Sequence, residues 1–174
     1  MHRVRLLAVF VIAAALATGC GGTSEQASNP AQDMNAALAK YAQAQEAFTQ
    51  VQTDLTPSTV TQAWLDDKMA KLARLRDAFE GVRSEAQSVD FPQEAGQKGQ
   101  PAQGTVDEFI AATDALITIE ENQLDQAQGC VDSGGSPYDC VMQVGTQSLL
   151  GAYPDILKRA QAAALQLQVE ASRA

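Results

Sequence analysis

Hydrophobic residues recur every three or four positions along four long stretches of the chain, at approximately 29–55, 56–89, 105–131 and 136–173. This spacing places them on one face of an α-helix, whereas the alternation typical of β-strands is scarce. The hydrophobic stripe of the last stretch includes Val141, Leu149, Tyr153, Ala160 and Leu167. The pattern therefore predicts an all-α protein.

Capping and turn residues mark the expected helix ends. Asn29 can cap the first helix, and Pro30 suits its first turn. Thr56–Pro57 is a start signal for the second helix. Thr105 with Glu108 three residues later fits a capping box at the start of the third.

The fourth stretch contains Gly151 and Pro154. We expect these residues to bend or break the helix, because proline cannot donate a hydrogen bond to the preceding turn.

The four stretches have similar lengths, so that each helix would be roughly 40–55 Å long at a rise of 1.5 Å per residue. Three connections and single hydrophobic stripes predict an antiparallel up-down-up-down four-helix bundle over residues 30–174. The same spacing also suits a coiled-coil seam. The alternative is therefore a long helical hairpin that completes its core by forming a homo-oligomer.

The N-terminal segment is typical of an export signal. Arg3 and Arg5 precede an apolar run at 6–16, and small residues lead up to Cys20. The apolar run is too short to span a bilayer as a helix, which needs about 20 residues.

The residues Ala17, Thr18, Gly19 and Cys20 resemble the lipobox of bacterial lipoproteins. The resemblance implies that a signal peptide at 1–19 is removed and that Cys20 carries a thioether-linked diacylglycerol. The chain would then be exported and anchored on the extracytoplasmic side of the cell membrane, with residues 20–29 as a flexible tether. An ordinary secretory signal and an uncleaved anchor are the alternatives. The Ala-rich and Gln-rich helices are similar in kind to those of small uncharacterised actinobacterial lipoproteins, which implies no particular activity.

Two further cysteines, Cys130 and Cys140, lie close together in the sequence. In an exported chain such an even pair predicts a structural disulfide bond, and the spacing does not fit a redox-active C-x-x-C motif. A free or redox-active pair is the alternative.

Charge and histidine content exclude several classes of function. The chain has 12 basic and 21 acidic residues, and loss of Arg3 and Arg5 with the signal would leave a net charge of −11. This composition argues against nucleic-acid binding, which depends on Lys and Arg. The single histidine, His2, would also be lost. A histidine-dependent triad and a catalytic zinc site are therefore not expected, and no metal or cofactor is predicted.

Two charged residues fall within the hydrophobic stripes, Lys68 in the second helix and Glu120 in the third. Because an unpaired buried charge is costly, we expect the two to lie near each other in a polar layer with Tyr41 and Tyr153. Three interpretations remain. In the first, the Lys68 side chain extends to the solvent-exposed edge of the bundle and Glu120 is half exposed. In the second, the pair is buried and sets the helix register, and in the third, the layer binds a ligand or catalyses a reaction.

Acidic residues also form a stripe on the third helix, at Asp107, Asp114, Glu121 and Asp125. This stripe could dock a basic partner or divalent cations, although it lacks the clustered ligands of a calcium loop. The alternative is an ordinary solvated face.

These features favour a non-enzymatic interaction or structural module of the cell envelope, with an envelope protein as its partner. The alternative is a bundle that binds or senses a small apolar ligand or a lipid, in a cavity near Gly145, Gly151 and Pro154. An enzyme that uses only carboxylates and tyrosines is the third hypothesis.

Overall fold

The computed structural model describes residues 30–51, 55–95 and 100–172, and these residues form a helical bundle without strands. The helices are α1 (Pro30–Thr49), α2 (Gln62–Ser88), α3 (Gln103–Asp132), α4 (Pro137–Leu149) and α5 (Tyr153–Ser172). The export signal, Cys20 and the tether lie outside the described residues. None of the described helices is both long and apolar enough to cross a membrane.

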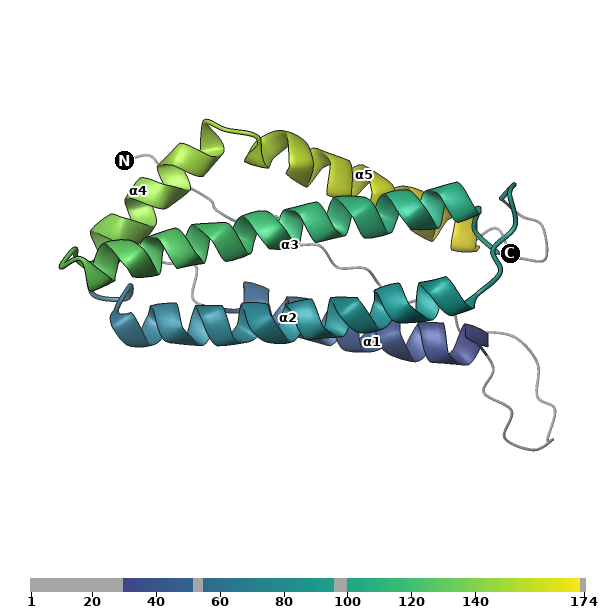
Figure 1. Ribbon diagram of the computed structural model, residues 1–174, viewed down its shortest axis with the longest axis horizontal. Coiled ribbons are helices and arrows are strands. Elements are labelled where there is room, and N and C mark those ends of the chain that lie inside the picture. Colours follow the sequence, from purple (N-terminus) through teal and green to yellow (C-terminus); the bar gives the residue numbers. More distant parts are fainter. Residues whose placement is uncertain (1–29, 52–54, 96–99, 173–174) are drawn as a thin grey trace.

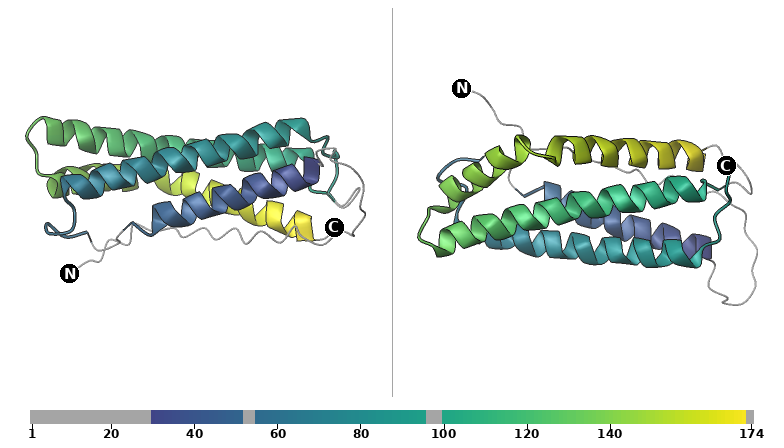
Figure 2. Two further views of the ribbon diagram at one scale, coloured as in Figure 1. Left: turned by 90° about the horizontal axis from the view of Figure 1, so that it is seen from below. Right: turned by 45° about the horizontal axis from the view of Figure 1, so that its top comes forward.

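The helices lie along the long axis of the molecule, and each main contact joins neighbours in the sequence or α3 with α5 (Figures 1 and 2). Helix α1 packs on α2, and α2 packs on α3. Helix α3 is then covered by α4 over its C-terminal part and by α5 over its N-terminal part. One end of the bundle therefore brings together the starts of α1 and α3 and the ends of α2 and α5 (Figure 1).

The hydrophobic stripes meet in one continuous core. Its largest fully buried side chains are Phe79, Phe109, Leu65, Val60, Val82 and Cys140. Because the stripes of α2 and α3 are long and regular, they supply most of these residues.

The second helix starts later than expected. Thr56 lies in a turn, and α2 begins only after Thr61, whose hydroxyl oxygen accepts a hydrogen bond from the backbone N–H of Trp64 at 3.2 Å. Thr56–Pro57 was therefore wrong as the start signal, because Thr61 provides the cap that Thr56 does not. Val60 is buried within this connection.

The predicted capping box of the third helix is also wrong. Helix α3 begins at Gln103 after Ala102, which has no side chain to cap it. Glu170 of α5 takes this role from across the bundle: its carboxylate accepts hydrogen bonds from the backbone N–H of Ala102 at 3.0 Å and from the Thr105 hydroxyl at 2.9 Å. The negative charge of this carboxylate also interacts favourably with the positive end of the dipole of α3.

The fourth stretch is broken, as expected from Gly151 and Pro154. Helix α4 ends at Leu149 and α5 begins at Tyr153, so that Pro154 lies in a first turn where it costs no hydrogen bond. The break tilts α4 away from the line of α5 (Figure 1). Leu149, which was expected in the hydrophobic stripe, is 42% exposed because it lies at this elbow.

Candidate functional site

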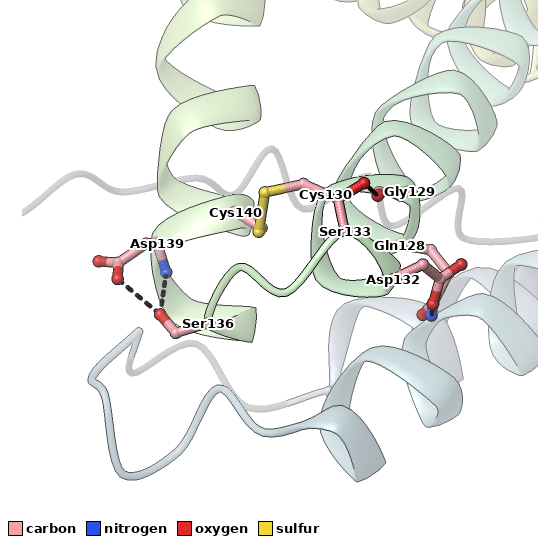
Figure 3. The surroundings of a disulfide bond; sticks show 8 residues. All are labelled: Gln128, Gly129, Cys130, Asp132, Ser133, Ser136, Asp139 and Cys140. Carbon is pink, nitrogen blue, oxygen red and sulfur yellow. Dashed lines mark hydrogen bonds between the residues drawn. A yellow bond between two sulfur atoms is a disulfide. The ribbon is translucent and has the colours of Figure 1, made fainter.

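The disulfide bond between Cys130 and Cys140 is confirmed, and it joins the end of α3 to the first turn of α4 (Figure 3). The turn between the helices suits this link. Gly134 has a φ of 95°, which favours glycine, and the Ser136 hydroxyl accepts a hydrogen bond from the backbone N–H of Asp139 at 3.2 Å. Gly135 lies so close that an added Cβ would be 2.5 Å from Cys140 Sγ.

Glu120 and Tyr153 meet between α3 and α5, where the Tyr153 hydroxyl donates a 2.7 Å hydrogen bond to Glu120 Oε1. Burial raises the pKa of Glu120, while this hydrogen bond and the charge of Lys68 oppose the increase. Burial and the neighbouring carboxylate also raise the pKa of Tyr153. Each side chain thus provides the partner that the other needs in a partly solvent-excluded position.

Lys68 points between α2 and α1. Its ammonium group donates a 2.8 Å hydrogen bond to the backbone oxygen of Phe48 and lies 3.5 Å from the centre of the Phe48 ring. Burial lowers the pKa of Lys68 to about 8, and the charge of Glu120 partly offsets this decrease. Lys68 and Glu120 therefore interact through their charges, while the hydrogen bond of Lys68 goes to α1.

Tyr41 lies in a different layer from Glu120. Its ring is buried 5.9 Å from the ring of Phe79, and its hydroxyl hydrogen-bonds Thr113, seven residues before Glu120 on α3. Burial raises the pKa of Tyr41. The four residues expected in one polar layer are thus divided between two layers, because Tyr41 faces α3 about two turns away from Glu120.

The space beside Tyr41 is small. Tyr41, Gln45 and Thr113 line a cavity of about 10 Å³, and the Gln45 amide oxygen has no hydrogen-bond partner among the described residues. A cavity of that size holds about one water molecule. It leaves no room for a substrate next to Tyr41.

Two of the four carboxylates in the acidic stripe of α3, Asp114 and Glu121, pair with arginine side chains of α2. Arg76 of α2 donates hydrogen bonds to both carboxylate oxygens of Glu121, at 2.8 and 2.7 Å, and also pairs with Asp114. Arg159 of α5 forms two hydrogen bonds with the carboxylate of Glu108, which lies outside this stripe, at 2.6 and 2.8 Å. These charge-assisted hydrogen bonds link α3 to α2 and to α5. Within the described ranges, no three His, Cys, Asp or Glu side chains form a group that could hold a metal ion.

An apolar pocket of about 200 Å³ lies at the end of the bundle where α1 and α3 start and α2 and α5 end. Two polar side chains, Asn35 and Gln100, also border it. The apolar lining consists of Met34 and Leu38 of α1, Val82, Ala86 and Val89 of α2, Phe91, Pro101, Val106, Phe109 and Ile110 around the start of α3, and Leu167 of α5.

This pocket was not predicted from the sequence. A cavity was expected near Gly145, Gly151 and Pro154, but this pocket lies far from the elbow between α4 and α5. One signal was present: the stretch at 90–104 is rich in Gly and Pro, which indicates a loop rather than a continuous helix before α3.

The two regions differ in what they can do chemically. The charged groups around Glu120 and Lys68 bind neighbouring side chains and backbone, whereas the end pocket presents open apolar surface with a polar edge. The pocket is therefore the better candidate for a binding site. No protein-family model, no curated protein and no solved structure matches this chain, so its function has to be argued from these sites alone.

Proposed function

We propose that the protein is an exported lipoprotein, anchored by lipid on Cys20 to the outer side of the cell membrane, whose bundle binds a small apolar ligand and catalyses no reaction. The residues before Cys20 support the anchor. In this proposal α4 and α5 together act as the fourth arm of an up-down-up-down four-helix bundle, interrupted at the elbow.

The apolar end pocket is the observation that favours ligand binding. Engineered cavities of about 150 Å³ lined by Leu, Ile and Phe bind benzene, so about 200 Å³ is enough for a small ring or a chain of several carbon atoms. Its lining comes from four helices and from the connection before α3. Ligands commonly bind between the helices of a bundle in such pockets.

The position of the pocket agrees with a membrane-derived ligand. Helix α1 begins at Pro30, at the pocket end of the bundle, only ten positions after Cys20 in the sequence. Fully extended, such a segment spans at most about 35 Å. An anchor on Cys20 would therefore keep the pocket end near the membrane, where apolar molecules are concentrated.

Benzene binding tests the pocket directly. We would add benzene to the full-length chain carrying Cys20→Ser and follow the methyl resonances of Leu38, Val82 and Ile110 by NMR. These signals should shift in a saturable manner. Leu167→Trp should abolish the shifts because the indole fills the pocket, whereas Leu165→Trp should not, because Leu165 is 62% exposed on the outside of the same helix.

Two results would contradict ligand binding. One is the absence of saturable shifts in the parent chain. The other is an equal response in the Leu167→Trp and Leu165→Trp chains, which would place benzene elsewhere on the protein.

The anchor is tested separately by metabolic labelling. Cells that express the full chain should incorporate labelled palmitate into it, and Cys20→Ser should remove the label and release the protein from the membrane fraction. Label that persists in the Cys20→Ser chain would exclude Cys20 as the anchor.

Binding of an envelope protein is the second candidate function, and exposed hydrophobic side chains favour it. Leu150 at the elbow is 86% exposed, and Leu149 and Leu165 are also exposed. Exposed apolar residues of this size are typical of interaction sites when they gather on one surface. Photo-crosslinking from position 150 in intact cells should then yield one discrete adduct, and the same label at the polar position Gln143 of α4 should not. Sedimentation of the purified chain shows whether that partner is a second copy.

A further inference from the structure

The polar edge of the end pocket contains an unused hydrogen-bond acceptor. The side-chain oxygen of Gln100 is buried and has no hydrogen-bond partner among the described residues. Asn35, the other polar residue of the lining, already takes part in an interaction of its own. A buried acceptor without a donor costs free energy, which a ligand with an N–H or O–H group would recover.

The electrostatic environment of the pocket disfavours an anionic ligand. Among the described residues that line it, none has a charged side chain. The carboxylate of Glu170 accepts a hydrogen bond from the backbone N–H of Ala102, which directly follows the lining residues Gln100 and Pro101. Because a charged head group would also have to give up water without gaining a counter-ion, a neutral polar group fits this edge best.

We propose that the end pocket binds a neutral amphiphile with a single short hydrocarbon chain, such as a medium-chain alcohol, and that the ligand's hydroxyl group donates a hydrogen bond to Gln100 Oε1. The hydrocarbon chain lies against the apolar lining and the hydroxyl group lies at the edge formed by Gln100. This inference rests on the proposed function, because it assigns a ligand class to the same pocket. The inference goes beyond the proposed function because it names Gln100 as the residue that distinguishes between ligands.

A series of ligands with one chain length tests this assignment. We would titrate the full-length Cys20→Ser chain with n-octane, 1-octanol, 2-octanone, octanoate and octylammonium, and measure dissociation constants from the same methyl resonances. 1-Octanol contains a donor, 2-octanone only an acceptor, octane neither, and the other two are charged. We expect 1-octanol to bind more tightly than 2-octanone and than both charged ligands.

The decisive variant is Gln100→Leu, which removes the acceptor and keeps a similar side-chain volume. It should weaken 1-octanol relative to octane by roughly three- to tenfold, which corresponds to one neutral hydrogen bond. We compare the ratio of the two dissociation constants, because a general change in the pocket affects both ligands and cancels in this ratio. Gln93→Leu is the matched control, because Gln93 is exposed on the same connection and does not line the pocket; it should leave the ratio unchanged.

The outcomes separate this inference from the function on which it rests. If octane and 1-octanol both bind but Gln100→Leu leaves their ratio unchanged, the pocket is real and the assignment to Gln100 is wrong. Equal or tighter binding of 2-octanone, octanoate or octylammonium also overturns the ligand class. If none of the five ligands shifts the pocket resonances, the proposed function fails together with the inference.

Discussion

Lys68 illustrates how one buried charge affects the stability of this molecule. Burial lowers its pKa from 10.5 to about 8, against the opposing charges of Glu120 and Asp67, while Lys71 adds to the decrease. Between these two pH values the unfolded chain binds more protons than the folded chain, so the contribution of Lys68 to the free energy of unfolding rises with pH. Below about pH 8 the folded state bears the full cost of the buried ammonium group.

We therefore predict that the difference in unfolding free energy between Lys68→Met and the parent chain is largest near pH 7 and shrinks toward pH 10. The variant should be more stable near neutral pH, by on the order of 2 kcal/mol, because methionine fills similar space without a charge. Urea denaturation of both chains across this range measures the difference, in which the titration of other groups cancels. A constant difference would show that the ammonium group is well solvated.

The polar residues between the helices could be predicted only in part from the sequence. The helical period alone placed Lys68 and Glu120 on inward faces, and the structure finds both partly buried. Their partners could not be predicted, because the register between helices decides them. The bond of Lys68 to the Phe48 backbone and the separation of Tyr41 from Glu120 both follow from that register.

At the scale of elements, the start of α3 depends on a residue 68 positions away in the sequence. We predict that Glu170→Ala destabilises the protein by about 1 kcal/mol, because the first turn of α3 loses its carboxylate partner. Ala102→Ser should restore part of this loss, since Ala102 has the extended backbone of an N-cap residue. Thermal unfolding of the two single variants and the double variant gives the comparison.

The serine hydroxyl would accept a hydrogen bond from the backbone N–H of Gly104 or Thr105, whereas Glu170 binds the backbone N–H of Ala102. The serine should therefore stabilise the Glu170→Ala chain and the parent chain by similar amounts. Unchanged stability of the Glu170→Ala chain would mean that its carboxylate does not support the start of α3.

The short helix α4 depends on its covalent link to α3. The disulfide bond closes a loop with a sequence separation of 10, so that replacing both cysteines by alanine should cost about 2–3 kcal/mol. Hydrogen exchange should accelerate mainly in α4, because its principal packing partner is α3. Reduction of the parent chain should reproduce the effect, whereas uniform acceleration in all helices would show that the bond stabilises the whole bundle rather than this element.

On the scale of the whole molecule, the proposed anchor would hold the pocket end of the bundle closer to the membrane than the opposite end. Helix α3 has 30 residues and is therefore about 45 Å long, so that the two ends of the bundle differ greatly in distance from any nearby surface. For the lipid-anchored chain on vesicles with nitroxide-labelled head groups, we predict stronger broadening of the Leu38 and Ile110 methyl signals than of the Val141 and Met142 signals. Equal broadening, or the reverse order, would contradict an anchored pocket end.

The local features of this protein could be predicted from its amino-acid sequence. The helical periodicity, the break before Pro154 and the disulfide bond all depend on residues close together in the chain, and the structure confirms each of them. The contacts between residues of different helices could not be predicted in this way. The relative shift of packed helices determines four such features: the cap from Glu170, the ion pairs of Arg76 with α3, the division of the polar layer and the end pocket. A hydrophobic stripe specifies which face of a helix is buried, but nearly the same apolar area is buried when neighbouring helices slide by one turn. The long-range contacts that choose among these registers are therefore visible only in the folded molecule.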